Sequence, residues 1–405
     1  MLKRWSWLTA AMIIVTGAFT FAAQAAEEDS SEAGLDLTLR TSAAAMPVLA
    51  ADGSALETPA SHMVLLDVTT GSVLAEKAAD KKMYPSSMTK MMTLYIIFDR
   101  LKQGTLTTSS QFTVSEKAWR MQGSKMFVPL GGQIGLEDLI RGIAIQSGND
   151  ACVVVAEGIA GSEEAFSVLM NETAKKLGMT GSNFKDASGW PSPDHTTTPH
   201  DLAALASALI RDFPEYYHYV SEREFTYHGI RQFNRNLLLG NAALHVDGLK
   251  TGHTEAAGYG ITLSATEPAT KRRLVLVING LDSEAARASE GERLLNWGFR
   301  NFDDATVFRA DQEITTAKVW MGADRELPLT VKENVLLSIP KAGQNTTKAT
   351  VEYASPLMAP VAQGQEVGKL KLTFANGTTK ELPLVAAKAT EKLSFFSRVA
   401  RGLGL

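Results

Sequence analysis

A nearly unbroken apolar run occupies residues 91–98, Met-Met-Thr-Leu-Tyr-Ile-Ile-Phe, and directly follows a short polar segment. Because Pro85 cannot continue a helix from upstream and Ser86 is a good N-cap, the pattern predicts a helix that starts at Ser87. Apolar residues on most sides of this helix predict that protein surrounds it. Lys90 then lies one turn after Ser87 on the same face, where its amine can reach the Ser87 hydroxyl. A hydroxyl and an amine at the mouth of a buried helix are a candidate nucleophile and base.

Regular patterns on both sides of this run predict the elements around it. Ahead of it, residues 63–68 and 72–75 are short apolar runs separated by a turn signal, which predicts a β-hairpin. Helical spacing of apolar residues predicts further helices, over residues 136–160 with a break at 147–149, 166–177 and 199–213. A polar loop, residues 186–195, separates the last two helices and is of the kind that walls a substrate cleft.

The pattern changes to that of strands in the second half of the chain. β-Branched and aliphatic residues predict neighbouring antiparallel strands over residues 247–253, 258–265 and 273–279. A helix over residues 285–299 follows them. Strands before and after a helical middle predict an α+β fold, in which an antiparallel sheet packs against helices. Beyond residue 302, short runs between turn signals predict a small β-sandwich, the clearest being residues 318–321, 333–339, 349–353 and 369–374.

The N-terminal segment, residues 1–25, is typical of a secretory signal peptide. Lys3 and Arg4 precede an apolar stretch over residues 7–21, and Ala23-Gln24-Ala25 supplies the small residues of a cleavage site. Because of this export signal, we expect the protein to act outside the cytoplasm. A retained N-terminal anchor is the alternative to a cleaved signal peptide.

The patterns divide the rest of the chain into four parts. Residues 26–58 lack a sustained period, and we expect a mostly disordered spacer. The domain that carries the candidate nucleophile spans residues 59–302, and a β-rich domain spans residues 303–389. The end, residues 390–405, is a basic amphipathic segment typical of a helix in an anionic membrane interface, and it is too short to span a bilayer. We expect a periplasmic protein attached peripherally to the cytoplasmic membrane; a docked terminal helix is the alternative.

Composition narrows the function classes. At 405 residues the chain is long enough for two domains, and 45% hydrophobic and 21% charged residues are usual for a soluble globular protein. A formal net charge of −4 gives no reason to expect nucleic-acid binding. Cys152 is the only cysteine, so no intrachain disulfide forms, and the three valines that follow it predict a buried apolar filler. We expect no metal and no cofactor.

Three short motifs carry the candidate chemistry. They are Ser87-x-x-Lys90, Ser147-Gly148-Asn149 in the break between two predicted helices, and Lys250-Thr251-Gly252 on a predicted strand. Ser-x-x-Lys alone is a weak signal, since the chain repeats it at residues 182–185, but each of the other two motifs occurs once. In this order the three resemble the motifs of penicillin-binding proteins and class A β-lactamases.

Longer strings extend the resemblance, at residues 87–93, 247–254 and 296–300. With the export signal, the β-rich domain and the amphipathic tail, they make the chain similar to the low-molecular-mass penicillin-binding proteins. Specifically, it resembles the serine-type D-alanyl-D-alanine carboxypeptidases of peptidase family S11. The resemblance implies a β-lactamase/transpeptidase-like catalytic domain and an enzyme that removes the terminal D-alanine from peptidoglycan stem pentapeptides. It also implies that β-lactam antibiotics acylate the same serine as inhibitors.

The resemblance implies a role for each motif residue. Ser87 attacks the carbonyl of the penultimate D-alanine and forms an acyl-enzyme. Lys90 is the expected base, because burial and a second ammonium, that of Lys250, both lower the pKa of a lysine. Ser147 and Lys250 relay the proton to the departing D-alanine, and Asn149 holds the peptide amide.

Further residues are expected around the substrate. The oxyanion hole of the family matches the backbone N–H groups of the nucleophile and of His253, and Gly252 lets a substrate backbone approach an exposed strand. Thr251 and Arg287 match positions that family members use around the free carboxylate of the substrate. The loop before Arg287 and residues 190–195 depart from the family pattern.

Three other functions agree with parts of the sequence. A class A β-lactamase shares all three motifs, but such enzymes carry a loop glutamate that activates the deacylating water, and no convincing equivalent lies between the second and third motifs. A D,D-endopeptidase that cuts crosslinks carries the same motifs. An inactive peptidoglycan-binding protein disagrees with the intact Ser87, Lys90 and Lys250.

Overall fold

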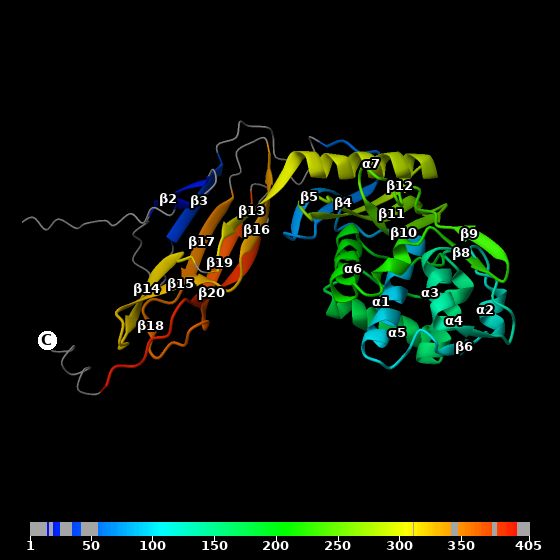
Figure 1. Ribbon diagram of the computed structural model, residues 1–405, viewed down its shortest axis with the longest axis horizontal. Coiled ribbons are helices and arrows are strands. Elements are labelled where there is room, and N and C mark those ends of the chain that lie inside the picture. The colour runs from blue at the N-terminus through cyan, green and yellow to red at the C-terminus, as the bar shows by residue number, and fades with distance from the viewer. Residues whose placement is uncertain are drawn as a thin grey trace, which may run out of the picture. The chain divides into compact units, whose positions relative to one another are not determined.

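The computed structural model describes residues 14–15, 19–24, 35–41, 56–310, 312–341, 347–374 and 379–394. The chain divides into two compact units, one of residues 51–300 and one of residues 1–50 together with 301–405 (Figure 1). The larger unit contains all three motifs.

A five-stranded antiparallel sheet forms the frame of the larger unit. Its strand order is β10-β11-β12-β4-β5, so the early hairpin pairs with a strand that comes much later in the chain. The strands are β4 (His62–Asp67), β5 (Ser72–Lys77), β10 (Val246–Thr254), β11 (Gly258–Thr266) and β12 (Arg273–Leu281). The predicted hairpin and the three predicted strands are confirmed.

Helices cover both faces of this sheet, as Figure 1 shows. Along one face lies α7 (Glu284–Asn301), so close that a Cβ on Gly291 would lie 2.6 Å from Leu263 Cδ1 on β11. On the other side lie α1 (Lys90–Lys102), α2 (Glu116–Arg120), α3 (Leu136–Ala144), α4 (Asn149–Ala160), α5 (Glu163–Lys176) and α6 (Pro199–Asp212). Short elements complete the unit: η2 (Tyr217–Ser221), β6 (Gln111–Thr113), β7 (Gln133–Gly135), β8 (Glu224–Tyr227) and β9 (Ile230–Phe233). The α+β prediction is confirmed.

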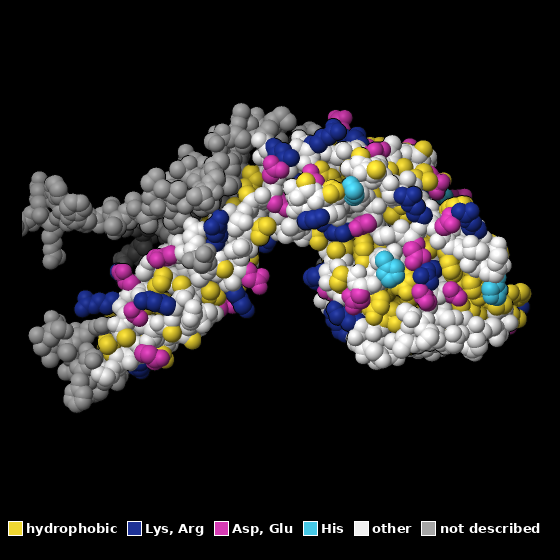
Figure 2. Space-filling view, viewed as in Figure 1, with side chains coloured by type: hydrophobic (Ala, Val, Ile, Leu, Met, Phe, Trp, Pro, Cys, Tyr) yellow, Lys and Arg dark blue, Asp and Glu magenta, His cyan; other side chains and the backbone are white. Residues whose placement is uncertain are grey.

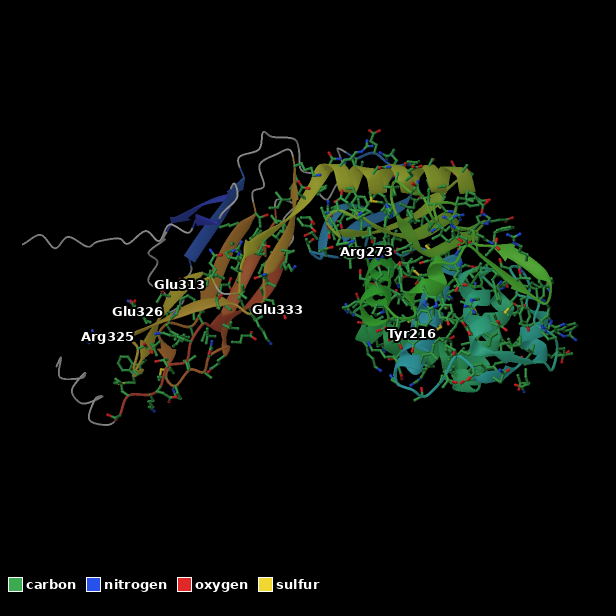
Figure 3. The ribbon with its side chains drawn as sticks, in the orientation of Figure 1. Tyr216, Arg273, Glu313, Arg325, Glu326 and Glu333 are labelled. Atoms are coloured by element: carbon green, nitrogen blue, oxygen red, sulfur yellow. The ribbon has the colours of Figure 1, made fainter. Side chains whose placement is uncertain are left out.

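The apolar run of α1 lies in the core of this unit. Met91, Met92 and Ile97 have no exposed surface. Phe98 stacks on Tyr216, which Figure 3 labels, with ring centroids 5.5 Å apart. Burying side chains of this size contributes about 1.5–3 kcal/mol each. The prediction of a helix surrounded by protein is confirmed, and its packing fixes the position of its first residue.

The predicted start of this helix is wrong. A 3-10 turn, η1 (Ser86–Thr89), precedes α1, and Ser86 has a φ of +49° and makes no side-chain cap. Its Oγ lies 3.3 Å from Thr254 Oγ1 at the end of β10 instead. A tertiary contact has replaced the local cap that the sequence predicted.

The described part of the smaller unit is built of strands. One sheet has nine strands in the order β1-β2-β3-β17-β19-β20-β15-β14-β18, and β13 pairs with β16 in a second. Their bounds are β1 (Ile14–Val15), β2 (Phe19–Gln24), β3 (Leu35–Thr41), β13 (Phe302–Phe308), β14 (Thr315–Trp320), β15 (Glu326–Val331), β16 (Val335–Pro340), β17 (Lys348–Tyr353), β18 (Leu357–Met358), β19 (Glu366–Thr373) and β20 (Thr379–Ala386). Both sheets contribute to one apolar core, for example through Leu337 and Leu370. The predicted β-rich domain is confirmed.

Charged side chains of both signs are interspersed on the face that Figure 2 shows. In the β-rich unit, Lys369 Nζ lies 2.9 Å from Glu381 Oε2, and Lys388 Nζ lies 2.9 Å from Asp324 Oδ1. Solvent and salt screen exposed pairs of this kind, so they contribute little to stability. The shared apolar core therefore stabilises this unit more than these ion pairs do.

The structure differs from the expected spacer at residues 35–41, which form β3 and pair with β17. In the sequence, Leu35, Leu37 and Leu39 alternate with polar residues, which is the period of a strand. The partner strand lies about three hundred residues later in the sequence, so no local pattern indicated the pairing.

At the other end of the chain, residues 390–394 do not begin a helix. Thr390 and Lys392 form isolated β-bridges with Val361 and Gly322. The rest of the predicted amphipathic segment, residues 395–405, lies outside the described residues. Within the described part of the chain, every helix is too short or too polar to cross a bilayer.

His200, the second residue of α6, links this helix to the segment around β5. Its Nε2 lies 3.0 Å from Glu76 Oε2, and its Nδ1 lies 2.8 Å from Asp80 Oδ1. The Glu76 carboxylate is the largest cause that raises the pKa of His200 to about 9. Because this value lies above the unfolded value of about 6.5, the stabilisation is complete below the unfolded pKa and is lost as the pH rises through the folded one.

Between about pH 6 and about pH 10, we expect the unfolding free energy of the native protein to fall by about 1 kcal/mol more than that of the His200→Asn variant. The expected difference is small because solvent weakens these partly exposed pairs. Urea unfolding of both proteins at both pH values, followed by tryptophan fluorescence, measures the difference. An equal loss in both proteins would show that another group is responsible.

Candidate active site

The first motif brings the Ser87 hydroxyl and the Lys90 amine into contact. Ser87 lies in η1, and Lys90 is the first residue of α1. The Lys90 Nζ lies 2.9 Å from Ser87 Oγ, within hydrogen-bond distance. The Lys90 side chain has no exposed surface, so the amine lies in a protein environment of low dielectric.

Two acceptors from distant parts of the chain hold the same amine. Asn149 Oδ1, at the N-terminus of α4, accepts at 2.8 Å, and the backbone oxygen of Ser188 accepts at 2.7 Å. The first two motifs therefore share one hydrogen-bond network, together with a loop that belongs to neither.

Burial is the main cause of a lowered pKa at Lys90, and the positive charge of Arg235 lowers it further. The charges of Lys90 and Lys250 interact, as expected from the sequence, and Arg235 adds a further positive charge that acts on both lysines. Burial, followed by the charges of Lys90 and Arg235, brings the pKa of Lys250 well below its ordinary value.

Asn149 is fixed by the segment that follows α2. Its Nδ2 donates to the backbone oxygen of Gln122 at 2.8 Å. The next residue, Asp150, is fully buried and accepts from the backbone N–H groups of Met126 and Phe127, each at 2.8 Å. Asn149 and Asp150, the first two residues of α4, are thus both held by backbone groups of residues 122–127.

Ser147 combines an unusual backbone conformation with an unused polar group. Its φ is +59°, in the left-handed region that non-glycine residues rarely adopt. Its Oγ is buried and makes no hydrogen bond with the described residues. An unpaired buried hydroxyl costs about 1–3 kcal/mol. Such costs gather at functional sites, where a ligand supplies the missing partner.

β10 places the third motif directly beside the nucleophile segment. A Cβ on Gly252 would lie 2.9 Å from the backbone oxygen of Pro85 and 3.3 Å from Ser86 Cβ, so glycine permits this close approach. Thr251 and Lys250 are both buried on the same strand, and Lys250 Nζ lies 3.3 Å from the Thr251 backbone oxygen. The structure therefore brings all three motifs to one place.

His253 and Arg287 are connected through an aromatic ring. The exposed His253 stacks on Tyr259 of β11 with centroids 3.9 Å apart. The Arg287 guanidinium lies 5.7 Å from the same ring, and its Nη2 lies 3.3 Å from Glu284 Oε1 and from the Arg235 backbone oxygen. Arg287 is buried, so α7 places a cation on the Tyr259 ring that also contacts His253.

The loop that the sequence marked as a cleft wall carries contacts that sequence reasoning missed. Asp186 Oδ1 accepts from the backbone N–H groups of residues 188–190 at 2.7–3.0 Å. Its Oδ2 lies 2.9 Å from His195 Nδ1, and His195 Nε2 lies 3.0 Å from Thr89 Oγ1. Burial alone would raise the pKa of Asp186, but these hydrogen bonds and the charge of His195 lower it to about 2. The network fixes the carbonyl that holds Lys90.

Known proteins share this sequence and architecture. Residues 48–283 match the D-alanyl-D-alanine carboxypeptidase family, peptidase S11, and residues 302–392 match the C-terminal domain of penicillin-binding protein 5. The D-alanyl-D-alanine carboxypeptidase DacC of Escherichia coli K12 is 40% identical over 343 residues, 83% of this chain and 85% of that protein. DacA of the same organism is 37% identical over 371 residues, 90% of this chain and 89% of that protein.

Solved structures agree with these relatives. Penicillin-binding protein 5 of Haemophilus influenzae has a TM-score of 0.75 and 35% identity, over 86% of this chain and 99% of that one. Penicillin-binding protein D2 of Listeria monocytogenes, in its cefotaxime-bound form, has a TM-score of 0.55 and 27% identity, over 60% of this chain and 98% of that one. With the three motifs assembled and both units matched, the chain belongs to the S11 family of D-alanyl-D-alanine carboxypeptidases.

Proposed function

We propose that the protein is a serine-type carboxypeptidase that removes the terminal D-alanine from peptidoglycan stem pentapeptides through an acyl-enzyme on Ser87. One observation carries the proposal: the buried Lys90 amine lies 2.9 Å from the Ser87 hydroxyl and contacts two further acceptors. The shared family of carboxypeptidases supports the choice of reaction.

The contacts of Lys90 suit a neutral amine, which has two N–H donors and one lone pair. Asn149 Oδ1 and the Ser188 backbone oxygen take the two donors, which leaves the lone pair directed at Ser87 Oγ. The lowered pKa favours this neutral form. Lys90 therefore takes the hydroxyl proton as Ser87 attacks the carbonyl of the penultimate D-alanine.

The rest of the reaction follows from where this proton goes. The bond between Ser87 Oγ and the carbonyl carbon forms, the peptide C–N bond breaks, and the proton passes from Lys90 through Ser147 and Lys250 to the departing amine. Ser147 Oγ makes no hydrogen bond with the described residues, so it keeps its donor and acceptor capacity for this step. Water then attacks the acyl-enzyme, with Lys90 again as the base, and releases the shortened peptide.

Backbone groups and the end of β10 bind the substrate in this proposal. The backbone N–H groups of Ser87 and His253 stabilise the oxyanion, and one such donor contributes about 2.7–4 kcal/mol in the transition state. Thr251 and Arg287 hold the free carboxylate, and the close approach of β10 at Gly252 supports this arrangement.

β-Lactams acylate the same serine in this proposal, because they present a reactive amide to the same nucleophile. The likeness to penicillin-binding protein D2 in its cefotaxime-bound form supports this point.

Export and membrane attachment also belong to the proposal. The charged start, apolar core and Ala23-Gln24-Ala25 of residues 1–25 support cleavage and release into the periplasm. The basic, amphipathic residues 395–405 support peripheral attachment to the cytoplasmic membrane.

The direct test combines release of D-alanine from a synthetic pentapeptide with labelling by a fluorescent penicillin. We expect D-alanine release and a label on the protein that is stable for minutes. Rapid turnover of the penicillin would indicate a β-lactamase, and cleavage of a crosslinked peptide dimer without D-alanine release would indicate an endopeptidase. Neither label nor release would indicate an inactive binding protein, and each of these three results contradicts the proposal.

A further inference from the structure

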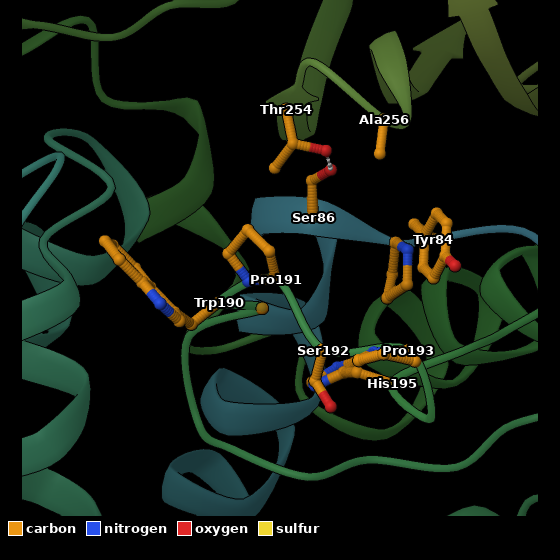
Figure 4. A pocket seen from close by; sticks show the side chains of 11 residues that line it. Tyr84, Ser86, Trp190, Pro191, Ser192, Pro193, His195, Thr254 and Ala256 are labelled. Atoms are coloured by element: carbon orange, nitrogen blue, oxygen red, sulfur yellow. Dashed lines mark hydrogen bonds between the residues drawn. The ribbon is translucent and has the colours of Figure 1, made fainter.

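A hollow with a mainly carbon lining lies beside the nucleophile segment (Figure 4). Its volume is about 220 Å³, below the roughly 300–1,000 Å³ of sites for drug-sized ligands, so it has room for a single side chain. Its walls include Tyr84, Trp190, Pro191, Pro193 and Ala256.

Three polar side chains in this lining, those of His195, Ser86 and Thr254, already have partners. His195 uses both ring nitrogens, one with Asp186 and one with Thr89, and so turns carbon atoms toward the hollow. Ser86 Oγ and Thr254 Oγ1 lie 3.3 Å apart and form a hydrogen bond with each other, as Figure 4 shows. An apolar group can enter without displacing these hydrogen bonds, whereas a charged group would lose hydration against a mainly apolar lining.

The hollow adjoins the catalytic residues through the chain itself. Ser86 directly precedes the nucleophile, Gly189 directly follows the carbonyl that holds Lys90, and Thr254 directly follows His253. The walls also touch one another, since a Cβ on Gly189 would lie 1.8 Å from the Ser86 backbone oxygen.

The direction of β10 indicates which part of a ligand reaches the hollow, and this step rests on the proposed function. There the leaving group and its carboxylate lie at Thr251, and the scissile carbonyl lies at the His253 N–H. Thr254 and Ala256 come after His253, on the side opposite to Thr251. The hollow therefore lies on the acyl side of the scissile bond.

We propose that the hollow is an acyl-side subsite that binds an uncharged alkyl or aryl group of the acyl donor. In a stem peptide this group is the aliphatic chain of the residue before the penultimate D-alanine, and in a β-lactam it is the acyl substituent. Trp190 remains 43% exposed beside the hollow, an apolar surface that such a group would cover. Trp190, Pro191 and Pro193 form a compact apolar stretch of this wall.

The test compares acylation of the full chain by two penicillins that differ in one apolar group. Benzylpenicillin carries a phenylacetyl group, and 6-acetamidopenicillanic acid carries an acetyl group. We expect the second-order acylation rate of the native protein to be at least about tenfold higher with benzylpenicillin, which corresponds to about 1.4 kcal/mol. A second pair, hexanoyl- and acetyl-D-alanyl-D-alanine, tests whether the hollow also binds the apolar group of a peptide substrate.

Ala256→Asp probes the hollow with little risk to the fold, because Ala256 is exposed in the turn between β10 and β11. We expect this variant to lose the preference while the acetyl compounds react nearly as before. Ala242→Asp, an equal change at an exposed turn outside the hollow, is the control and keeps the preference. A faster reaction of the larger member in either pair supports the subsite, and the pair that shows it tells whether the subsite binds β-lactams, peptides or both.

Equal native rates in both pairs, or an equal fall with both members of each pair in Ala256→Asp, would overturn the inference. Absence of acylation by every compound is a different result. It would refute the proposed function and, with it, the subsite.

Discussion

Replacing Ser87 with alanine abolishes the fluorescent penicillin label and lowers D-alanine release by at least about 10⁴-fold. Without Oγ no acyl-enzyme forms. The rest of the network is expected to remain, because Lys90 keeps its contacts with Asn149 Oδ1 at 2.8 Å and with the Ser188 backbone oxygen at 2.7 Å. Gel fluorescence after incubation with the penicillin measures the label, and an enzymatic assay for D-alanine measures turnover.

The chain offers a matched control in its second Ser-x-x-Lys sequence. Ser182 Oγ lies 2.6 Å from Asp201 Oδ2 and 2.8 Å from Thr197 Oγ1, a structural role away from Lys90. The Ser182→Ala variant therefore keeps the label while it remains folded. A label that persists in Ser87→Ala, or one that a folded Ser182→Ala variant loses, would overturn the assignment of the nucleophile.

Replacing Lys90 with methionine slows acylation of Ser87 by about 10²–10⁴-fold, the usual contribution of a general base. Methionine has a similar length and suits the buried position, but it has no lone pair that can take the hydroxyl proton at this pH. The native rate falls as the pH drops, because a protonated Lys90 cannot act as a base. Since burial lowers the Lys90 pKa, this fall occurs at a lower pH than an ordinary lysine would give.

Labelling rates over a range of pH, for the native protein and for Lys90→Met, measure both effects. The variant loses the acid limb as well as most of the rate. Lys102→Met changes an exposed lysine at the other end of α1 and serves as the control. An unchanged acid limb in Lys90→Met would show that another group is the base.

The arrangement of helices and strands could be predicted from the sequence where a periodic pattern and burial agree. β12 is a long aliphatic strand, and α1 is apolar on nearly every side. The start of α1 could not be predicted in the same way. Ser86 has the chemistry of an N-cap, but its hydroxyl partner, Thr254, lies 168 residues away.

The candidate site shows the same limit. Its motif residues could be named because each motif is a contiguous string with side-chain chemistry of its own. The third contact of Lys90 is a backbone oxygen, 98 residues away at Ser188, and a backbone oxygen has no sequence identity. Asp186 followed by Ser188 and Gly189 is a turn signal, yet it does not tell which amine the turn will hold. Arg235 acts through its charge from a loop with no motif.

The amine of Lys90 meets partners from η1, from α4 and from the loop at Ser188, so its basicity is a product of folding. In a newly made or denatured chain this lysine has the ordinary pKa of about 10.4 and stays protonated at neutral pH. Ser87 is then no more reactive than any other serine. Only a folded molecule is therefore labelled by the antibiotic. In heat or urea titrations, the amount of label measures the fraction of chains in which these three distant segments are still assembled.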